Sequence, residues 1–163
     1  MQASDYYQGL CAFLSDPALA LMLETYELVL DVYPHPKFAG LADLFAVERP
    51  RVNVLEEPPV LTRYDACVTD ISSVAYDFAY LGRYVQYFLP DCPQFRAGMH
   101  ELRVFEPPQV FGPHAETPEN ALAQLCEAAK RGFAPEEEYR ERMEGFFYQL
   151  EDGLEKVYRA IMA

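Results

Sequence analysis

The sequence has no tryptophan, only three histidines and half as many basic as acidic residues. Its 13 Lys and Arg accompany 26 Asp and Glu, which gives a formal net charge of −13 at pH 7. A nucleic-acid surface requires clustered basic side chains, and so does a patch that holds a protein on anionic lipid. The composition therefore argues against a nucleic-acid surface and against a lipid-binding patch. An anionic ligand would have to be bound by local features such as helix termini and hydroxyl groups.

Paired cysteines and metal-ligand spacings are also missing. No C-x-x-C occurs, and the histidines are scattered; the residues concerned are Cys11, Cys67, Cys92, Cys126, His35, His100 and His114. Reduced thiols are the rule in the cytosol, whereas a metal site requires clustered ligands. We therefore expect free thiols, no metal and no cofactor.

Several signatures of other protein classes are absent. No apolar run approaches the roughly 20 residues of a membrane-spanning helix, and residues 1–15 show no signal peptide. There is no P-loop, no G-x-G-x-x-G and no G-x-S-x-G. With 163 residues, 51% of them hydrophobic, residues 1–163 are expected to form a single domain with a substantial core.

The most informative stretch is 66–91, ACVTDISSVAYDFAYLGRYVQYFLPD. A short apolar strand at 66–69 precedes two serines, an apolar helix at 74–81, a glycine and a strand at 84–89 rich in β-formers. A strand, a helix and a strand of these lengths predict a βαβ unit with parallel strands.

The rest of the chain continues this alternation. Asp16-Pro17 and Thr117-Pro118 are clear helix starts, each with a capping side chain followed by proline at the first helical position. The pattern predicts helices at 5–14, 17–25, 40–46 and 118–131, a mostly helical C-terminal segment at 135–163, and strands at 26–33, 51–55, 102–105 and 110–111. This order predicts an α/β fold with a doubly wound parallel sheet of the Rossmann-like kind.

Ser72 and Ser73 mark a candidate anion site. The helix that they open begins at the carboxyl end of a parallel strand, where ligands bind in open α/β sheets. A helix N-terminus offers unpaired N–H groups and partial positive charge, which suit a phosphate. The alternative is an ordinary serine cap beside a second serine, and spacing alone does not exclude it.

Three blocks of sequence resemble the CDP-glycerol glycerophosphotransferases, which polymerise poly(glycerol phosphate) and related teichoic acids. The first is TDISSV at 69–74 with Asp77-Phe78 and the strand RYVQYF at 83–88, similar to a family pattern T-D-[YF]-S-S. The second is YPHP at 33–36, similar to a His-Pro motif, and the third is FGP at 111–113, similar to G-F-G-P. Val110 replaces the first glycine of the third motif, and residues 92–108 match the family poorly.

The resemblance implies the C-terminal, Rossmann-like half of a two-domain enzyme of the GT-B glycosyltransferase type. That half would bind CDP-glycerol or CDP-ribitol, and the other half, which would precede this chain and is expected to be absent from it, would supply the acceptor side and a second catalytic group. The expected product is a teichoic-acid or capsule-like polymer of the bacterial cell wall. The expected location is the cytoplasm, with membrane contact at the inner face only through other parts of the full-length enzyme.

The resemblance also assigns site residues. His35 is expected to be catalytic, contacting the donor pyrophosphate and stabilising charge on the leaving CMP; the other expected binding residues are Ser72, Ser73, Asp77 and Gly112. As plain structural residues, His35 would be a loop histidine and Asp77 an acid near a helix N-terminus. The aromatic residues Tyr76, Phe78 and Tyr80 are expected in the core.

Two other functions are compatible with the same pattern. One is a sugar-nucleotide glycosyltransferase or epimerase half-domain, which would prefer uridine or guanosine over cytidine. The other is a non-catalytic interaction module that docks a partner through its apolar C-terminal helix.

Overall fold

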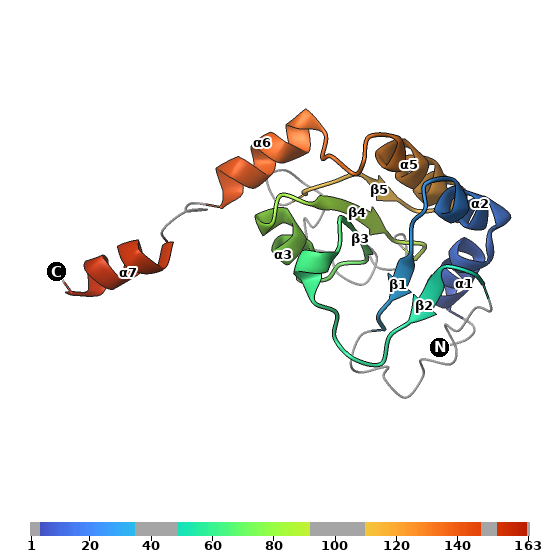
Figure 1. Cartoon of the computed structure of the whole chain (residues 1–163), viewed down its shortest axis with the longest axis horizontal. Helices are drawn as coiled ribbons and strands as arrows, with labels where there is room; N and C mark the ends of the chain where they lie inside the picture. Colours follow the sequence, from blue (N-terminus) through green and yellow to red (C-terminus); the bar gives the residue numbers. More distant parts are fainter. Residues whose placement is uncertain (1–3, 35–48, 92–109, 148–152, 163) are drawn as a thin grey trace.

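A computed structural model describes residues 4–34, 49–91, 110–147 and 153–162, apart from two side chains in the last helix. The chain forms an α/β structure (Figure 1). Its elements are α1 (Asp5–Ser15), α2 (Pro17–Thr25), β1 (Leu30–Val32), β2 (Val52–Val54), the 3₁₀ turn η2 (Leu61–Arg63), β3 (Ala66–Thr69), α3 (Val74–Tyr80), β4 (Tyr84–Phe88), β5 (His114–Ala115), α5 (Pro118–Lys130), α6 (Glu137–Phe146) and α7 (Gly153–Met162).

All strand pairs among the described residues are parallel. One sheet joins β1 to β2, with Asp31 opposite Asn53, and the other has the order β3-β4-β5. In the second sheet Thr69 of β3 lies opposite Tyr87 of β4. The predicted βαβ unit is therefore confirmed, because α3 connects two neighbouring parallel strands.

Helices cover both faces of β4, as a buried parallel strand requires. Tyr84 and Phe88 belong to a core with α1, α2 and α5, to which side chains of β1 and β2 also contribute. Val85 and Tyr87 belong to a second core with α3 and α6. Figure 1 shows the same division, with α1, α2 and α5 on one side and α3 and α6 on the other. The α/β class and parallel pairing agree with the prediction.

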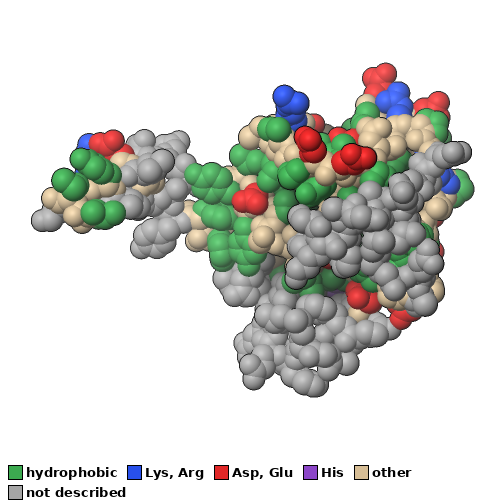
Figure 2. All heavy atoms as spheres, turned by 90° about the horizontal axis from the view of Figure 1, so that it is seen from below, with side chains coloured by type: hydrophobic (Ala, Val, Ile, Leu, Met, Phe, Trp, Pro, Cys, Tyr) green, Lys and Arg blue, Asp and Glu red, His purple; other side chains and the backbone are tan. Residues whose placement is uncertain are grey.

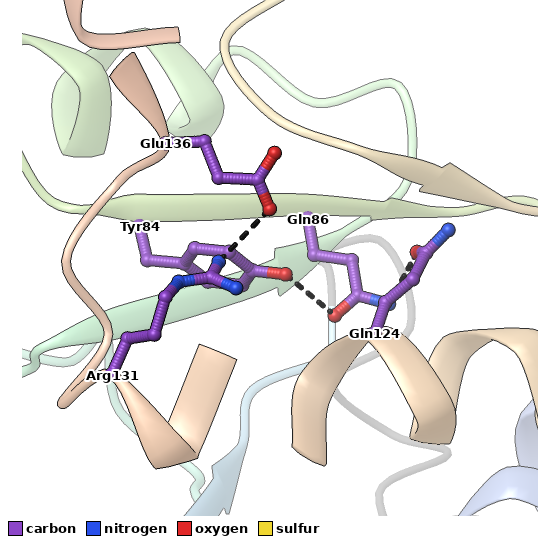
Figure 3. Close-up of polar contacts among 5 residues, drawn as sticks. All are labelled: Tyr84, Gln86, Gln124, Arg131 and Glu136. Atoms are coloured by element: carbon purple, nitrogen blue, oxygen red, sulfur yellow. Dashed lines mark hydrogen bonds and ion pairs between the residues drawn. The ribbon is translucent and has the colours of Figure 1, made fainter. Parts of the chain in front are cut away.

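A polar network attaches β4 to α5 (Figure 3). Gln86 is fully buried, and its amide nitrogen donates to the Ala121 carbonyl at 2.9 Å and to the Gln124 side chain at 3.1 Å. The Tyr84 hydroxyl donates to the Gln86 side-chain oxygen at 3.4 Å, and Gln124 donates to the His114 carbonyl at 2.9 Å. A buried amide is costly unless it is hydrogen-bonded, so this network holds α5 in one position on the sheet.

Phe111 fills the second core. It is completely buried, and its ring contacts those of Tyr76, Phe146 and Phe147 at centroid distances of 5.3, 5.2 and 5.8 Å. Of the three aromatic residues predicted in the core from α3, Phe78 is buried, whereas Tyr76 and Tyr80 are 39% and 50% exposed. These two rings therefore line the flank of the core instead of filling it.

The structure corrects some predicted boundaries. The strand expected at 26–33 is limited to β1, because Glu27 has φ of 54° and breaks the extended run before it. The strand expected at 110–111 is wrong: these residues are buried without strand pairing, and the pairing with β4 occurs at β5. The elements expected at 40–46 and 102–105 lie outside the described residues.

The C-terminal segment forms two separate helices. α6 packs on the second core through Met143, which is 3% exposed. α7 lies apart from it, with Tyr158, Ile161 and Met162 between 63% and 76% exposed. Figure 2 shows hydrophobic side chains on the surface of α7 and on the flank of the main body nearest to it. No helix in the described part of the chain is long and apolar enough to cross a membrane.

Candidate functional site

The candidate site lies at the carboxyl end of β3, where residues Asp70–Ser73 connect the strand to α3. Because β3 and β4 are parallel and in register at Thr69 and Tyr87, the residues that follow β4 reach the same edge of the sheet. This edge is where open α/β sheets bind their ligands.

The two serines at this edge have different local roles. The Ser72 hydroxyl accepts from the Val74 backbone N–H at 3.4 Å, and the Ser72 carbonyl accepts from the Ala75 N–H at 3.2 Å. Ser73 occupies the N-cap position with helical backbone angles, but its side chain makes no capping hydrogen bond. The structure therefore agrees with the prediction that a serine oxygen accepts from a backbone N–H of the first turn, and that serine is Ser72; the side chain of the second serine, Ser73, is exposed to solvent.

Asp77 lies in the first turn of α3, one helical turn after Ser73, and is exposed. Positions four residues apart lie on the same face of a helix, so Ser73 and Asp77 share one exposed face, as predicted. This places Asp77 beside the candidate site, and its part in binding stays a prediction.

Gly112 has a packing role that the motif did not reveal. A Cβ atom on Gly112 would lie 1.6 Å from the Val85 carbonyl oxygen, so only glycine fits against the backbone of β4 here. The next residue, Pro113, accepts from the Tyr87 N–H at 2.8 Å and starts the pairing of β5 with β4. The contacts of Gly112 are thus packing contacts in the middle of the sheet, and its role in substrate binding stays a prediction.

His35, the expected catalytic residue, lies outside the described residues, as does Cys92. The chain is described up to Tyr33 and Pro34, directly after β1. The role of the His-Pro motif therefore stays a prediction. In the described ranges, no group of three or more His, Cys, Asp or Glu could hold a metal ion.

Sequence reasoning missed a contact that α1 makes with this edge. The Tyr6 hydroxyl donates to Asp70 Oδ2 at 3.3 Å, across 64 residues of sequence. Gly9 brings α1 close to the end of β4, since a Cβ on Gly9 would lie 2.2 Å from the Pro90 Cβ. No motif in the sequence identifies Asp70 as the partner of Tyr6.

Burial and the nearby carboxylates change the acidity of two groups here. Burial, then Asp70 and finally Asp91 raise the pKa of Tyr6, so its hydroxyl keeps its proton at neutral pH. Burial, with a further contribution from Asp70, raises the pKa of the Cys67 thiol to about 12. Cys67 is therefore a neutral thiol and not a thiolate nucleophile.

The start of α3 presents the hydroxyls of Ser72 and Ser73, with the carboxylates of Asp70 and Asp77 nearby, whereas the N–H groups of Val74, Ala75 and Tyr76 already donate to Ser72 and Ser73. One comparison with known proteins bears on this: the family model of CDP-glycerol:poly(glycerophosphate) glycerophosphotransferase matches residues 18–163. No curated protein and no solved structure matches the chain.

Proposed function

Because this chain belongs to the CDP-glycerol:poly(glycerophosphate) glycerophosphotransferase family, we propose that it is the donor-binding domain of a polyol-phosphate transferase. The donor is CDP-glycerol or CDP-ribitol, and the acceptor is a teichoic-acid or capsule-like polymer. The observation that carries the proposal is the family match over residues 18–163, which includes the whole β3–α3–β4 unit and its two serines. The parallel α/β architecture supports a Rossmann-like domain of the GT-B type.

In the proposed reaction, an acceptor hydroxyl attacks the β-phosphorus of the donor. A new P–O bond forms to the acceptor, whose hydroxyl proton passes to a general base, while the bond from the β-phosphorus to the bridging oxygen breaks and CMP leaves with the electron pair. The chain would contribute positioning and charge stabilisation. Ser72 and Ser73 would hold the donor phosphates at the start of α3, with Asp77 and Gly112 nearby, and His35 would stabilise charge on the leaving CMP.

We further propose that the acceptor is activated by another half of the enzyme, working at the cytoplasmic face of the membrane. The 163-residue chain should then bind donor without releasing CMP in the presence of a glycerol-phosphate primer. The loss of acceptor positioning alone removes a term worth roughly 7–11 kcal/mol in well-oriented systems. Release of CMP at a rate typical of complete enzymes would contradict this division of labour.

The proposal is tested by calorimetry of the chain with a panel of nucleotides: CDP-glycerol, CDP-ribitol, CMP, UDP and a UDP-sugar. We expect binding of the cytidine ligands, with the CDP-polyols tightest. A preference for uridine ligands would instead support a sugar-nucleotide transferase or epimerase. Absence of nucleotide binding at millimolar concentration, together with a stable complex or dimer, would support a non-catalytic interaction module.

A further inference from the structure

Part of the hydrophobic surface formed by α3 and α6 is exposed. Its rings form one contiguous group, which we call the aromatic flank: Tyr76, Tyr80, Phe146 and Phe147. Phe146 contacts Tyr76 and Phe147 at centroid distances of 5.6 and 5.2 Å, and Tyr80 contacts Phe147 at 5.5 Å. Three of these rings nevertheless remain 37% to 50% exposed. A contiguous exposed group of large apolar side chains is typical of an interaction surface.

The second exposed surface is the apolar face of α7. Tyr158, Ile161 and Met162 are three and four residues apart, so they share one face of the helix. All three side chains are at least 63% exposed. α7 has 10 residues, and a helix of that length is marginal in water unless its apolar face packs on another surface. The stability of α7 therefore calls for a surface that covers this face.

The two surfaces carry opposite charges. α7 has two basic residues, Lys156 and Arg159, against one acid, Glu155, in a chain whose net charge is −13. Exposed acids border the aromatic flank: Asp77 lies on α3 between its two tyrosines, and Glu144 lies on α6 two residues before its first phenylalanine. Figure 2 shows an acidic side chain among the hydrophobic ones on the part of the main body nearest to α7. Complementary charge favours a contact between α7 and a flank, whereas two flanks facing each other would bring like charges together.

A second copy of the chain can cover both surfaces at once. α7 projects away from the main body (Figure 1), and its apolar face and the aromatic flank of the same chain are both exposed. Two copies related by a two-fold axis, the commonest symmetry of homo-oligomers, could exchange their helices and so bury two helices on two flanks. We propose that the chain forms a homodimer in which α7 of each copy packs its apolar face on the aromatic flank of the other. The inference goes beyond the proposed function and does not depend on it, since the dimer requires no nucleotide.

The short length of α7 makes this dimer weak. Each exchanged helix buries only a few side chains, so the interface lies at the low end of the sizes found in specific complexes. We expect a dissociation constant of roughly 10–100 µM. At low micromolar concentration the chain is then a monomer, and its melting temperature does not depend on the contact of α7. Sedimentation velocity from about 1 µM to about 1 mM measures the association.

Two substitutions each remove one of the surfaces. Ile161→Ser shortens the apolar face of α7, and Tyr80→Ser removes a ring from the aromatic flank. Each should weaken the dimer at least about tenfold, because each contact occurs twice in it. The matched control is Leu21→Ser on α2, whose side chain is 65% exposed but lies outside both surfaces; this variant should dimerise like the wild type. Ile161 is 76% exposed, so Ile161→Ser tests the inference even if Tyr80→Ser fails to fold.

Isotope-filtered NMR shows whether the helices are exchanged. In a concentrated mixture of ¹³C-labelled and unlabelled chains, the methyl groups of Ile161 on one chain should contact aromatic rings of the flank on the other. A wild-type chain that stays monomeric at about 1 mM would overturn the inference. It would also be overturned by wild-type affinity in Ile161→Ser, which indicates contact between flanks, or in a folded Tyr80→Ser, which indicates contact between helices. Contacts of Ile161 with the flank of its own chain alone would overturn it as well.

Discussion

Among the described glycines, Gly112 leaves the least space for a side chain. A Cβ there would overlap the Val85 carbonyl, so Gly112→Ala must push the segment off β4 and disturb the Phe111 core. We expect a loss of at least about 3 kcal/mol in the free energy of unfolding, measured by urea titration. The matched control is Gly145→Ala in α6, where nothing lies within 4 Å of the added Cβ. It should stabilise the protein by about 0.5–1 kcal/mol, since alanine favours a helix. Similar effects of the two substitutions would contradict the assigned packing role.

At the scale of elements, the N-termini of α3 and α5 differ in whether the side chain at the N-cap position forms a capping hydrogen bond. Thr117 caps α5 by accepting from the Asn120 N–H at 3.3 Å, so Thr117→Ala should cost about 1 kcal/mol of stability. Ser73 caps nothing with its side chain, so Ser73→Ala should change stability by less than about 0.5 kcal/mol. Urea unfolding of both variants measures the difference. A large destabilisation by Ser73→Ala would mean that the serine serves the fold, and it would remove one reason to assign it to the donor.

The two C-terminal helices give a second prediction at this scale. α6 is anchored by buried Met143, so Met143→Ala should cost about 2–5 kcal/mol. α7 exposes Tyr158, Ile161 and Met162, so deleting residues 153–163 should leave the melting temperature of the remaining domain unchanged within about 2 °C. A large drop on deletion would show that α7 packs on the domain in solution.

The elements that could be predicted are those with local signals. Asp16 and Thr117 are each followed by proline, and these pairs correctly predicted where α2 and α5 begin. The apolar runs and Gly82 correctly predicted the β3–α3–β4 unit. The features that could not be predicted depend on contacts between distant segments. β5 is a strand only because Pro113 and Ala115 meet β4, and Tyr6 meets Asp70 only once α1 has packed beside Pro90. Of the candidate site, the sequence could therefore indicate the serine loop and Asp77, but not the contact between Tyr6 and Asp70.

At the scale of the whole molecule, phenols and a thiol that are buried (Tyr84 and Tyr87) or partly buried (Tyr6 and Cys67) predict sensitivity to alkali. Burial raises the pKa of Tyr6, Tyr84 and Tyr87, and raises that of Cys67 to about 12. These groups ionise at lower pH in the unfolded chain, from about pH 9 for the thiol and about pH 10 for the phenols. The unfolded state therefore binds fewer protons above pH 9, and stability, fully present below that pH, should fall steadily toward pH 12. Urea unfolding between pH 7 and 11 measures this fall. Cys67→Ala should raise the pH at which the free energy of unfolding begins to fall, because the thiol ionises first in the unfolded chain. Constant stability up to pH 11 would contradict the raised pKa values of these groups.

The proposed function requires that the loop between β3 and α3 binds the donor phosphates. Its most direct test is the affinity of the Ser72→Ala, Ser73→Ala double variant for CDP-glycerol, measured by calorimetry beside its urea unfolding curve. We expect a loss of affinity of at least tenfold, while the free energy of unfolding falls by no more than about 1 kcal/mol for the lost Ser72 bond to Val74. Unchanged affinity in a folded double variant would contradict the claim.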